Sequence, residues 1–395
     1  MADKREVVVV GCVRAAIGSF GGTLKDLSSS ALGALVVKEA ISRSNIDPSQ
    51  IGQLVCGNVI HGEARDMYVS RAIALDAGMA QESCALTLNR LCGSGLQAIV
   101  SAANAIQLGD TDAAIGCGVE SMSRAGYLMP AARFGARMGD TKLVDMMVGA
   151  LTDPFSPNHM GITAENVAEQ FGITRGQQDA LALESQRRAV AAIAAGHFKS
   201  QIVPIEIQGR KGTVLFDTDE YPKADISPEG LAKLKPAFKK DGTVTAGNAS
   251  GINDGAAAVV MMEAAAAAKA GLKPLARLVA YAVAGVDPSI MGTGPIPAVK
   301  LALKRAGLAV KDIDVIESNE AFAAQALCVT KSLDFDPAKV NPNGGAVALG
   351  HPLGATGAIL TVKCLYELER TGKRYGLVTM CIGGGQGIAG IFERL

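Results

Sequence analysis

Hydrophobic positions change their spacing within residues 85–110, and the change predicts a strand that turns directly into a helix. Ala85–Leu88 has the pattern of a short buried strand. The apolar positions that follow recur at helical spacing, at Leu96, Ile99, Val100, Ala103 and Ile106. The turn between the two elements contains Cys92, Gly93 and Gly95, and glycine allows the backbone to turn tightly beside a ligand.

The beginning of the chain alternates between strand and helix patterns. Glu6–Val10 and Ile51–Val55 are apolar runs of strand length, and Ala31–Ser42 between them has helical spacing. The serines at positions 28 to 30 suit the N-cap of this helix. Its inward side chains are expected to be Leu32, Leu35, Val36 and Ile41. Strand, helix and strand in this order indicate a parallel sheet covered by helices.

The last third of the chain repeats this pattern at an offset of 262 residues, which is the separation of Gly95 from Gly357. A helix over Val299–Ala306 and a strand over Ile313–Glu317 match their counterparts in the first half. A single offset that holds over about fifty positions indicates an internal repeat. The sequence therefore predicts two similar α/β halves.

The repeat also places the turn around Cys92 over the turn around His351. If the halves pack about a pseudo-twofold axis, the two turns face one cleft and bring these side chains together. The alternative is that His351 only caps its own helix.

Between the repeats lies a region of different character, roughly residues 121–249. It contains Met-rich and Pro-containing segments, a helix pattern over Arg175–Ala195, and a charged stretch, Gly209–Lys240, expected to be surface loop with short strands. Insertions of this kind commonly carry binding loops on a rigid scaffold. A buried strand, Ala256–Met262, and a helix, Ala264–Ala270, follow.

Composition narrows the class of protein. A chain of 395 residues with 49% hydrophobic and 19% charged residues is globular and long enough for two or three domains. Lys plus Arg equals Asp plus Glu at 38 each, so charge does not favour nucleic acid as a partner. The N-terminus resembles neither a signal peptide nor a presequence, and no apolar run reaches membrane-spanning length. We therefore expect a cytoplasmic protein.

The eight cysteines are scattered without paired spacing, which favours reduced thiols over disulfides or a metal site. Six of them are expected to be mostly structural: Cys12, Cys56, Cys84, Cys117, Cys328 and Cys364. Cys92 differs because a helix N-terminus lowers a thiol pKa and favours a thiolate nucleophile. The alternative is that Cys92 is one more small buried residue.

Three further stretches concentrate unusual residues: Ser318–Phe322, Asn343–Gly357 and Val378–Gly387. The last contains a second candidate thiol, Cys381. The glycine run after Cys381 is either a ligand-binding loop, without a P-loop lysine, or a tight turn in a buried hairpin.

Together these stretches closely resemble the thiolase family. The motifs are NRLCGSGLQ around Cys92, NEAFAAQ from Asn319, GGAVALGHPLGATG around His351 and CIGGGQGIA from Cys381, with TAGNASGINDGAA from Thr245 and HMG from His159. The resemblance covers nearly the whole chain. It implies an α/β fold of two repeated βαβ-type halves in five layers, α-β-α-β-α, with an inserted loop domain. The implied domains are 1–121 with 252–273, 122–251 and 274–395.

The resemblance also implies roles for individual residues. Cys92 would take the acyl group as a thioester, and His351 would move the proton between this thiol and coenzyme A. Cys381 would remove the α-proton of a second acetyl-CoA. One oxyanion hole would use His351 and a water held by Asn319, and another the backbone N–H groups of Cys92 and Gly383.

The substrates implied are coenzyme A thioesters, namely acetyl-CoA and acetoacetyl-CoA, with free CoA as the leaving group and no permanently bound cofactor or metal. Ser250 and His159 match positions that touch the pantetheine arm, and Met160 and Phe322 match positions that line the acyl pocket. Lys223 stands where the family often has an arginine near the CoA nucleotide. Likeness to the family also implies a homotetramer.

The leading hypothesis is a reversible condensation of two acetyl-CoA into acetoacetyl-CoA. A broader 3-ketoacyl-CoA thiolase, for β-oxidation or for polyhydroxyalkanoate precursors, shares the same catalytic residues. Ketoacyl synthases commonly use two histidines instead of the Cys381 motif. A thiol redox protein or a non-catalytic CoA-binding module is the alternative from another class, and it leaves Asn319 and His351 unexplained.

Overall fold

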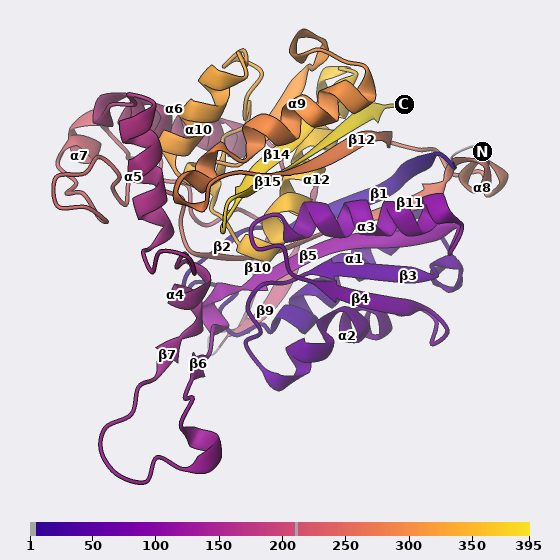
Figure 1. Ribbon diagram of the computed structural model, residues 1–395. Coiled ribbons are helices and arrows are strands. Elements are labelled where there is room, and N and C mark those ends of the chain that lie inside the picture. Colours follow the sequence, from indigo (N-terminus) through magenta and orange to yellow (C-terminus); the bar gives the residue numbers. More distant parts are fainter. Residues whose placement is uncertain (1–4, 210–211) are drawn as a thin grey trace.

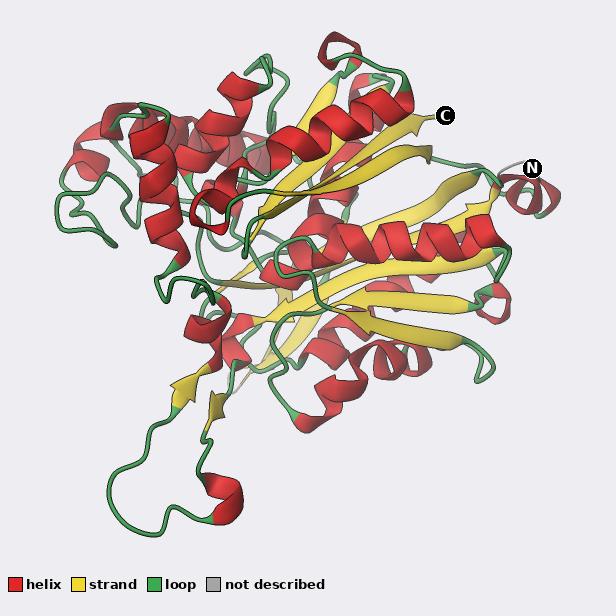
Figure 2. Cartoon of the chain, in the orientation of Figure 1, coloured by secondary structure: helices red, strands yellow, loops and turns green. Residues whose placement is uncertain are grey.

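The computed structural model describes residues 5–209 and 212–395, and it contains one long mixed sheet with helices on both sides (Figures 1 and 2). The strand order is β13-β14-β15-β12-β1-β11-β5-β3-β4. These strands are β1 (Val7–Ala15), β3 (Gln53–Gly57), β4 (Cys84–Leu88), β5 (Ala113–Ser121), β11 (Asn253–Glu263), β12 (Ala276–Gly285), β13 (Val315–Ser318), β14 (Tyr375–Ile382) and β15 (Gln386–Arg394). Two short strands, β2 (Gly18–Ser19) and β8 (Ile202–Val203), join β11 and β1.

The sheet is narrow at its centre, where it divides into two halves. Strands β1 and β12 share only the pairs Val8–Arg277 and Val9–Ala276, whereas each pairs along most of its length with a strand of its own half. The prediction of two α/β halves is confirmed. The sheet is mixed rather than all parallel, because β11 and β15 run antiparallel to their neighbours.

Two equivalent helices fill the middle layer between the halves of the sheet. They are α3 (Ser94–Leu108), which packs mainly on β5 and β3, and α12 (Leu353–Thr371), which packs on β11, β5 and β14. The outer layers are α1 (Ser29–Ser44) and α2 (Val69–Asp76) on one side, and α9 (Pro295–Ala306) over β12 and β15 on the other. Together they form the expected five layers.

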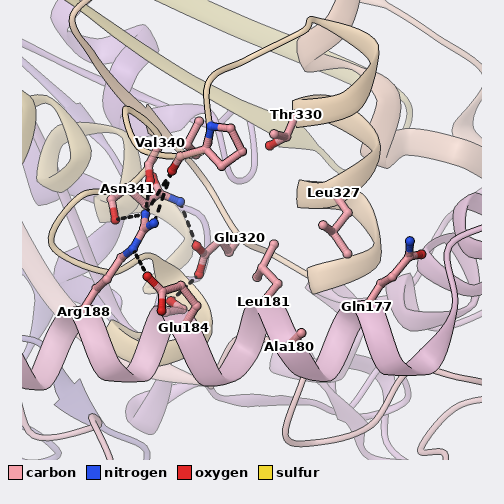
Figure 3. A pocket seen from close by; sticks show the side chains of 12 residues that line it. Gln177, Ala180, Leu181, Glu184, Arg188, Glu320, Leu327, Thr330, Val340 and Asn341 are labelled. Atoms are coloured by element: carbon pink, nitrogen blue, oxygen red, sulfur yellow. Dashed lines mark hydrogen bonds and ion pairs between the residues drawn. The ribbon is translucent and has the colours of Figure 1, made fainter.

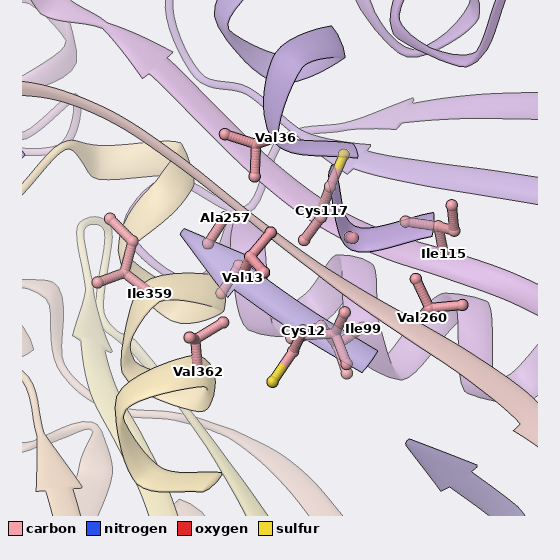
Figure 4. Packing of buried hydrophobic residues seen from close by; sticks show 14 of the residues in the cluster. Cys12, Val13, Val36, Ile99, Ile115, Cys117, Ala257, Val260, Ile359 and Val362 are labelled. Atoms are coloured by element: carbon pink, nitrogen blue, oxygen red, sulfur yellow. The ribbon is translucent and has the colours of Figure 1, made fainter. Parts of the chain in front are cut away.

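The main core lies where these layers meet. Val13 of β1 and Val260 of β11 pack in one cluster with Val36 of α1, Ile99 of α3 and Ile359 of α12 (Figure 4). All five side chains are at most 2% exposed. The first and last thirds of the chain therefore share one hydrophobic core, and neither half buries its central helix alone.

The repeat inferred from the sequence is visible where α3 and α12 cross. A Cβ built on Gly95 would lie 2.6 Å from the backbone nitrogen of Ala358. A Cβ built on Gly357 would lie 2.2 Å from that of Leu96. Because both glycines lack a side chain, the two backbones touch directly. The two residues related by the 262-residue offset thus stand at the same helix crossing.

Two expectations of burial were wrong, one for the side chain of Leu35 and one for the strand Ala85–Leu88. Leu35 is 43% exposed, because α1 turns Leu32, Val36 and Ile41 toward the core and carries Leu35 on another face. The strand at Ala85–Leu88 is an edge strand and not a buried one. Only β3 pairs with β4 among the described residues, and Leu86 is 46% exposed.

The remaining short elements lie in the middle region and between the strands that follow it. The predicted helix over Arg175–Ala195 is confirmed as α6 (Arg175–Ala194). Further elements are β6 (Tyr127–Leu128), β7 (Val144–Asp145), α4 (Met146–Ala150), α5 (Met160–Gln170), β9 (Ile205–Gly209), β10 (Gly212–Phe216), α7 (Pro228–Ala232), α8 (Ala264–Lys269), α10 (Ala323–Ser332) and α11 (Ala346–Leu349). Strands β6 and β7 form the base of an arm that projects from the body (Figure 1). Residues 210–211 of the charged stretch and residues 1–4 of the first domain lie outside the described ranges.

Within residues 5–209 and 212–395, no helix combines the length and the hydropathy that crossing a bilayer requires.

Replacing Gly357 by alanine should destabilise the fold, because the new methyl group collides with the backbone of α3. We expect a loss of about 1–3 kcal/mol in the free energy of unfolding, measured by urea denaturation. Gly176→Ala on α6 is the matched control, since a Cβ there meets no atom within 4 Å. It should be neutral or slightly stabilising. Equal stability of the two variants would contradict a direct helix contact.

Candidate active site

Cys92 lies in the tight turn between β4 and α3. The turn is held by Ser94, whose hydroxyl accepts from the Arg90 N–H at 2.8 Å and donates to the Leu91 carbonyl at 2.7 Å. Leu91 has a φ of 44°, a left-handed conformation that is strained for a branched side chain. Such strain is typical of functional turns. The half-buried Cys92 packs against an apolar cluster that includes Leu353, two residues after His351.

The expected low pKa of Cys92 was wrong. Burial raises the pKa of this thiol to about 11, although the backbone N–H groups of Gly383 and of Cys92 itself lower it. The cost of burying a thiolate therefore outweighs the favourable helix N-terminus. The thiol is protonated at neutral pH, so its use as a nucleophile requires a base.

His351 is 5% exposed and sits just before α12. Its Nδ1 lies 2.6 Å from Oγ1 of Thr356, and this hydroxyl donates its own hydrogen to the Pro352 carbonyl at 3.0 Å. Nδ1 must therefore carry the ring proton and donate it to Thr356. Nε2 is left as an acceptor, the tautomer that a base requires. His351 does contact its own helix, as the alternative reading of the sequence expected, but only through the hydrogen bond between Nδ1 and Thr356. Nε2 takes no part in this contact.

Burial lowers the pKa of His351 to about 4, so the imidazole is neutral at physiological pH. Nε2 lies 3.4 Å from Nδ2 of Asn319, which follows β13. The Asn319 backbone N–H donates to Thr379 on β14 and fixes the residue against the sheet. Its Oδ1 is buried without a hydrogen-bond partner among the described residues. A buried amide oxygen of this kind suits a water or a substrate group.

Cys381 lies near the end of β14 and is fully buried. Burial raises the pKa of this thiol, and the nearby Cys92 raises it further, so the two sulfurs occupy one site. The sulfur packs in an apolar cluster with Met160, Met291 and Phe322. This environment keeps Cys381 as a neutral thiol.

The glycine run after Cys381 forms the turn of the β14–β15 hairpin. Gly384 and Gly385 have φ of 81° and 85°, which favour glycine. A Cβ on Gly383 would lie 3.2 Å from Leu91 and 3.3 Å from Met160. The hairpin alternative is thus confirmed, and the Gly383 N–H in this turn lowers the pKa of the Cys92 thiol.

The residues expected to contact coenzyme A gather around an aromatic side chain that sequence analysis did not single out. The ring of His159 stacks on Phe238 at 4.6 Å between centroids, and Phe238 meets Phe322 edge-on at 6.1 Å. Nδ1 of His159 accepts from the Gly161 N–H at the start of α5. The sequence signal was an isolated Phe238 within the basic segment KPAFKK.

Ser250 and Lys223 lie on neighbouring loops of this wall. The Ser250 N–H donates to the Ala321 carbonyl, beside Phe322. Nζ of the exposed Lys223 lies 5.7 Å from the centroid of the Tyr221 ring, and Tyr221 packs closely against Gly251. The Tyr221 ring is thus near both the Lys223 side chain and Gly251, the residue that follows Ser250. The ammonium of Lys223 is at the surface.

A separate cavity of about 400 Å³ lies between α6 and α10 (Figure 3). Its lining is largely apolar and includes Leu181 and Leu327, with Glu320 at one side. Glu320 accepts from Ser185 and Asn341 and follows Asn319 in sequence. None of the ten predicted site residues lines this cavity. It is therefore distinct from the site around Cys92.

Two family models match the chain. The thiolase N-terminal domain matches residues 7–265, and the thiolase C-terminal domain matches residues 272–394. The chain belongs to the thiolase family.

Individual thiolases are similar over their whole length. Beta-ketothiolase BktB of Cupriavidus necator is 66% identical over 392 residues, which cover 99% of this chain and 100% of that protein. The crystal structure of the Bacillus anthracis acetyl-CoA acetyltransferase has a TM-score of 0.97 at 46% identity and covers 99% of both chains. Human mitochondrial 3-ketoacyl-CoA thiolase in complex with CoA has a TM-score of 0.96 at 45% identity, covering 99% of this chain and 98% of that one.

Alkylation of Cys92 by iodoacetamide should accelerate with pH up to about pH 10, because only the thiolate reacts and the pKa of this thiol is raised to about 11. The measurement is the rate of Cys92 modification by peptide mapping, with free N-acetylcysteine as the reference. A rate that levels off near the ordinary thiol pKa of about 8.5 would contradict the effect of burial.

Proposed function

We propose that this thiolase is an acetyl-CoA C-acetyltransferase, which joins two acetyl-CoA reversibly into acetoacetyl-CoA and CoA through an acyl-cysteine. The observation that supports the proposal is that two protonated thiols lie close enough for Cys92 to raise the pKa of Cys381, while the neutral imidazole of His351 can accept a proton at Nε2. Covalent acyl transfer needs such a nucleophile and base. A redox role would leave the His351 tautomer and Asn319 without use.

In the first half-reaction, Cys92 transfers its proton to Nε2 of His351 and attacks the thioester carbonyl of acetyl-CoA. The CoA thiolate then leaves and takes the proton back from the imidazolium. Thr356 fixes the ring orientation in both steps, because its hydroxyl holds Nδ1. The product is acetylated Cys92 and free CoA.

In the second half-reaction, the Cys381 thiol gives its proton to Nε2 of His351, and the resulting thiolate removes an α-proton from a second acetyl-CoA. The carbanion attacks the acetyl carbonyl, and Cys92 leaves as a thiolate that takes the proton from the His351 imidazolium. The apolar surroundings of Cys381 make its thiolate a strong base, since they raise its pKa. The same surroundings keep bulk water from competing with the carbanion.

Two groups of hydrogen-bond donors stabilise the developing oxyanions. The N–H groups of Cys92 and Gly383, which lower the pKa of the Cys92 thiol in the free enzyme, serve the acyl carbonyl. His351 and a water held by Asn319 serve the enolate of the second acetyl-CoA. Loss of one such donor typically costs about 10²–10³ in kcat.

The coenzyme A arm runs along Ser250 and His159, with Met160 and Phe322 at the acyl end and Lys223 attracting the nucleotide phosphates. The aromatic stack of His159, Phe238 and Phe322 supports this path because it forms a rigid apolar wall. A lysine acts on phosphate as a point charge and does not form the fork of an arginine. CoA thioesters are thus the substrates of the proposed reaction, and it needs no permanently bound cofactor.

A broader 3-ketoacyl-CoA thiolase is the second candidate. It is supported by the 66% identity to beta-ketothiolase BktB and by the flexible methionines Met160 and Met291 beside Cys381. Methionine side chains adapt to ligands of different shape.

We propose the division of the chain into a first half, 1–121 with 252–273, a loop domain, 122–251, and a second half, 274–395. The insertion of β11 between β1 and β5 supports it, since residues 253–263 complete the first half of the sheet. All eight cysteines are free thiols, which supports the proposal that the protein is located in a reducing cytoplasm.

We also propose a homotetramer. The arm between β6 and β7 exposes large apolar side chains, including Phe134 and Met138 at 89% and 97% exposure, and β4 leaves one sheet edge open. Exposed apolar surface and open edges of this extent favour association with another chain.

The acyl-enzyme is tested by intact mass after brief incubation with acetyl-CoA and an acid quench. We expect one acetyl group on the Cys92 peptide, none in Cys92→Ala, and an adduct without acetoacetyl-CoA formation in Cys381→Ala. Cys328→Ala, a buried thiol on α10, is the control that should behave as the parent. Faster turnover of longer 3-ketoacyl-CoAs than of acetoacetyl-CoA would favour the second candidate. CoA binding without any adduct would favour the non-catalytic alternative.

The assembly is tested by light scattering coupled to size-exclusion chromatography. We expect a mass of four chains of 40.5 kDa each, and a smaller assembly for the double variant Phe134→Ser, Met138→Ser. Val214→Ser with Leu215→Ser on β10 is the matched control, because these side chains are also exposed but lie outside the arm. A parent of 40.5 kDa would refute the tetramer.

A further inference from the structure

The carboxylate of Glu120, at the end of β5, is completely buried at the junction of the two halves. It has no ion-pair partner among the described residues, and it accepts four hydrogen bonds from two separate segments. The donors are the N–H of Val59 at 3.1 Å, the N–H of Ile60 at 3.0 Å, Nδ2 of Asn58 at 3.2 Å and the N–H of Gly354 at 2.8 Å. The first three belong to one half of the molecule and Gly354 to the other.

One side of this network leads to Cys92. The Asn58 N–H donates to the Leu88 carbonyl at the end of β4. Nδ2 of Asn89 donates to the Val59 carbonyl at 3.4 Å, and its Oδ1 accepts from the Leu91 N–H at 2.8 Å. The segment that Glu120 binds therefore supports the turn immediately before the nucleophile.

The other side leads to His351. Gly354 lies in the first turn of α12, where backbone N–H groups lack partners within the helix. Glu120 fills this role from the opposite half, and thereby fixes the turn that carries Thr356. Oγ1 of Thr356 in turn holds Nδ1 of His351. A Cβ at position 354 would lie 2.8 Å from the Glu120 carboxylate, so the close approach requires glycine.

The chemistry of the network requires a carboxylate and not an amide. Four N–H groups point at two oxygens, and a glutamine would direct its own NH₂ at some of them. Burial raises the pKa of Glu120 to about 7, while the N–H groups of Ile60, Gly354 and Val59 favour the charged form. After burial itself, the negative charge of Glu120 also contributes to the raised pKa of Cys92.

We infer that Glu120 is a positioning residue for the thiolase reaction, because its carboxylate ties the Cys92 turn and the His351 turn into one arrangement across the pseudo-twofold interface. It acts through Gly354 and the segment 58–60, and it contacts neither substrate nor the reacting atoms. This inference rests on the proposed function for the roles of Cys92 and His351.

The test compares Glu120→Gln with Glu393→Gln. Glu393 is a second buried carboxylate, bound by Arg277 and Arg374 far along β15 from both turns. We expect Glu120→Gln to lower kcat about 10- to 100-fold, because small misplacements of reacting groups have effects of this size. Its KM should stay within about twofold of the parent, since the CoA wall is untouched. Glu393→Gln should keep the parent kcat, whatever its melting temperature.

A second variant covers the case in which Glu120→Gln does not fold. Asn58→Ala removes one donor and leaves the charge, so we expect a smaller loss of kcat with the same unchanged KM. A kcat within about twofold of the parent in the variant that folds would overturn the inference. An equal loss of kcat in Glu393→Gln would overturn it as well, because it would reveal a general effect of stability.

A readout independent of turnover separates this inference from the proposed function. Removal of the Glu120 charge should shift alkylation of Cys92 by iodoacetamide to lower pH, and Glu393→Gln should leave that profile in place. A shift in a protein without acetyl transfer would sustain the Glu120 network and refute the proposed function. An unchanged profile in an active enzyme, together with normal kcat, would refute the network alone.

Discussion

The contact on which the structure depends is the crossing of α3 and α12, where Gly95 and Gly357 let two backbones touch. Each helix follows a turn that carries a chemical group, Cys92 in one case and His351 in the other. Because the helices cannot separate or slide without opening the core, the distance between these two turns is set by main-chain contact. A flexible side chain at either glycine would remove that constraint.

Burial then determines the protonation of the site. Both thiols have raised pKa values and the imidazole has a lowered one, so all three groups are neutral in the free enzyme. Charge arises only during proton transfer, next to N–H groups that are already in place. A permanently ionised thiol beside the apolar cluster of Met160 and Phe322 would be costly to bury. Glu120 is the exception, because burial raises its pKa to about 7 while the N–H groups around it favour the charged form.

Residues 122–251 contribute aromatic and methionine side chains to the surroundings of the site. They supply His159, Met160 and Phe238, which pack on Phe322 from the second half. The turns that carry Cys92 and His351 come from the repeated halves, and much of the aromatic wall comes from residues 122–251. Substitutions in the wall can therefore change its shape without altering the helix crossing behind the two turns.

The sequence by itself determined the helix period of α3 and α6, the repeat that pairs Gly95 with Gly357, and the four motifs that identify the family. These features depend on local spacing and residue type, which a linear pattern records directly. Only the tertiary structure decided that Leu35 and β4 are exposed, that the Cys92 thiol is protonated, and that Phe238 and Glu120 join the site. Burial and pKa depend on which distant segments surround a group, and Phe238 and Glu120 act through partners that lie far away in the chain.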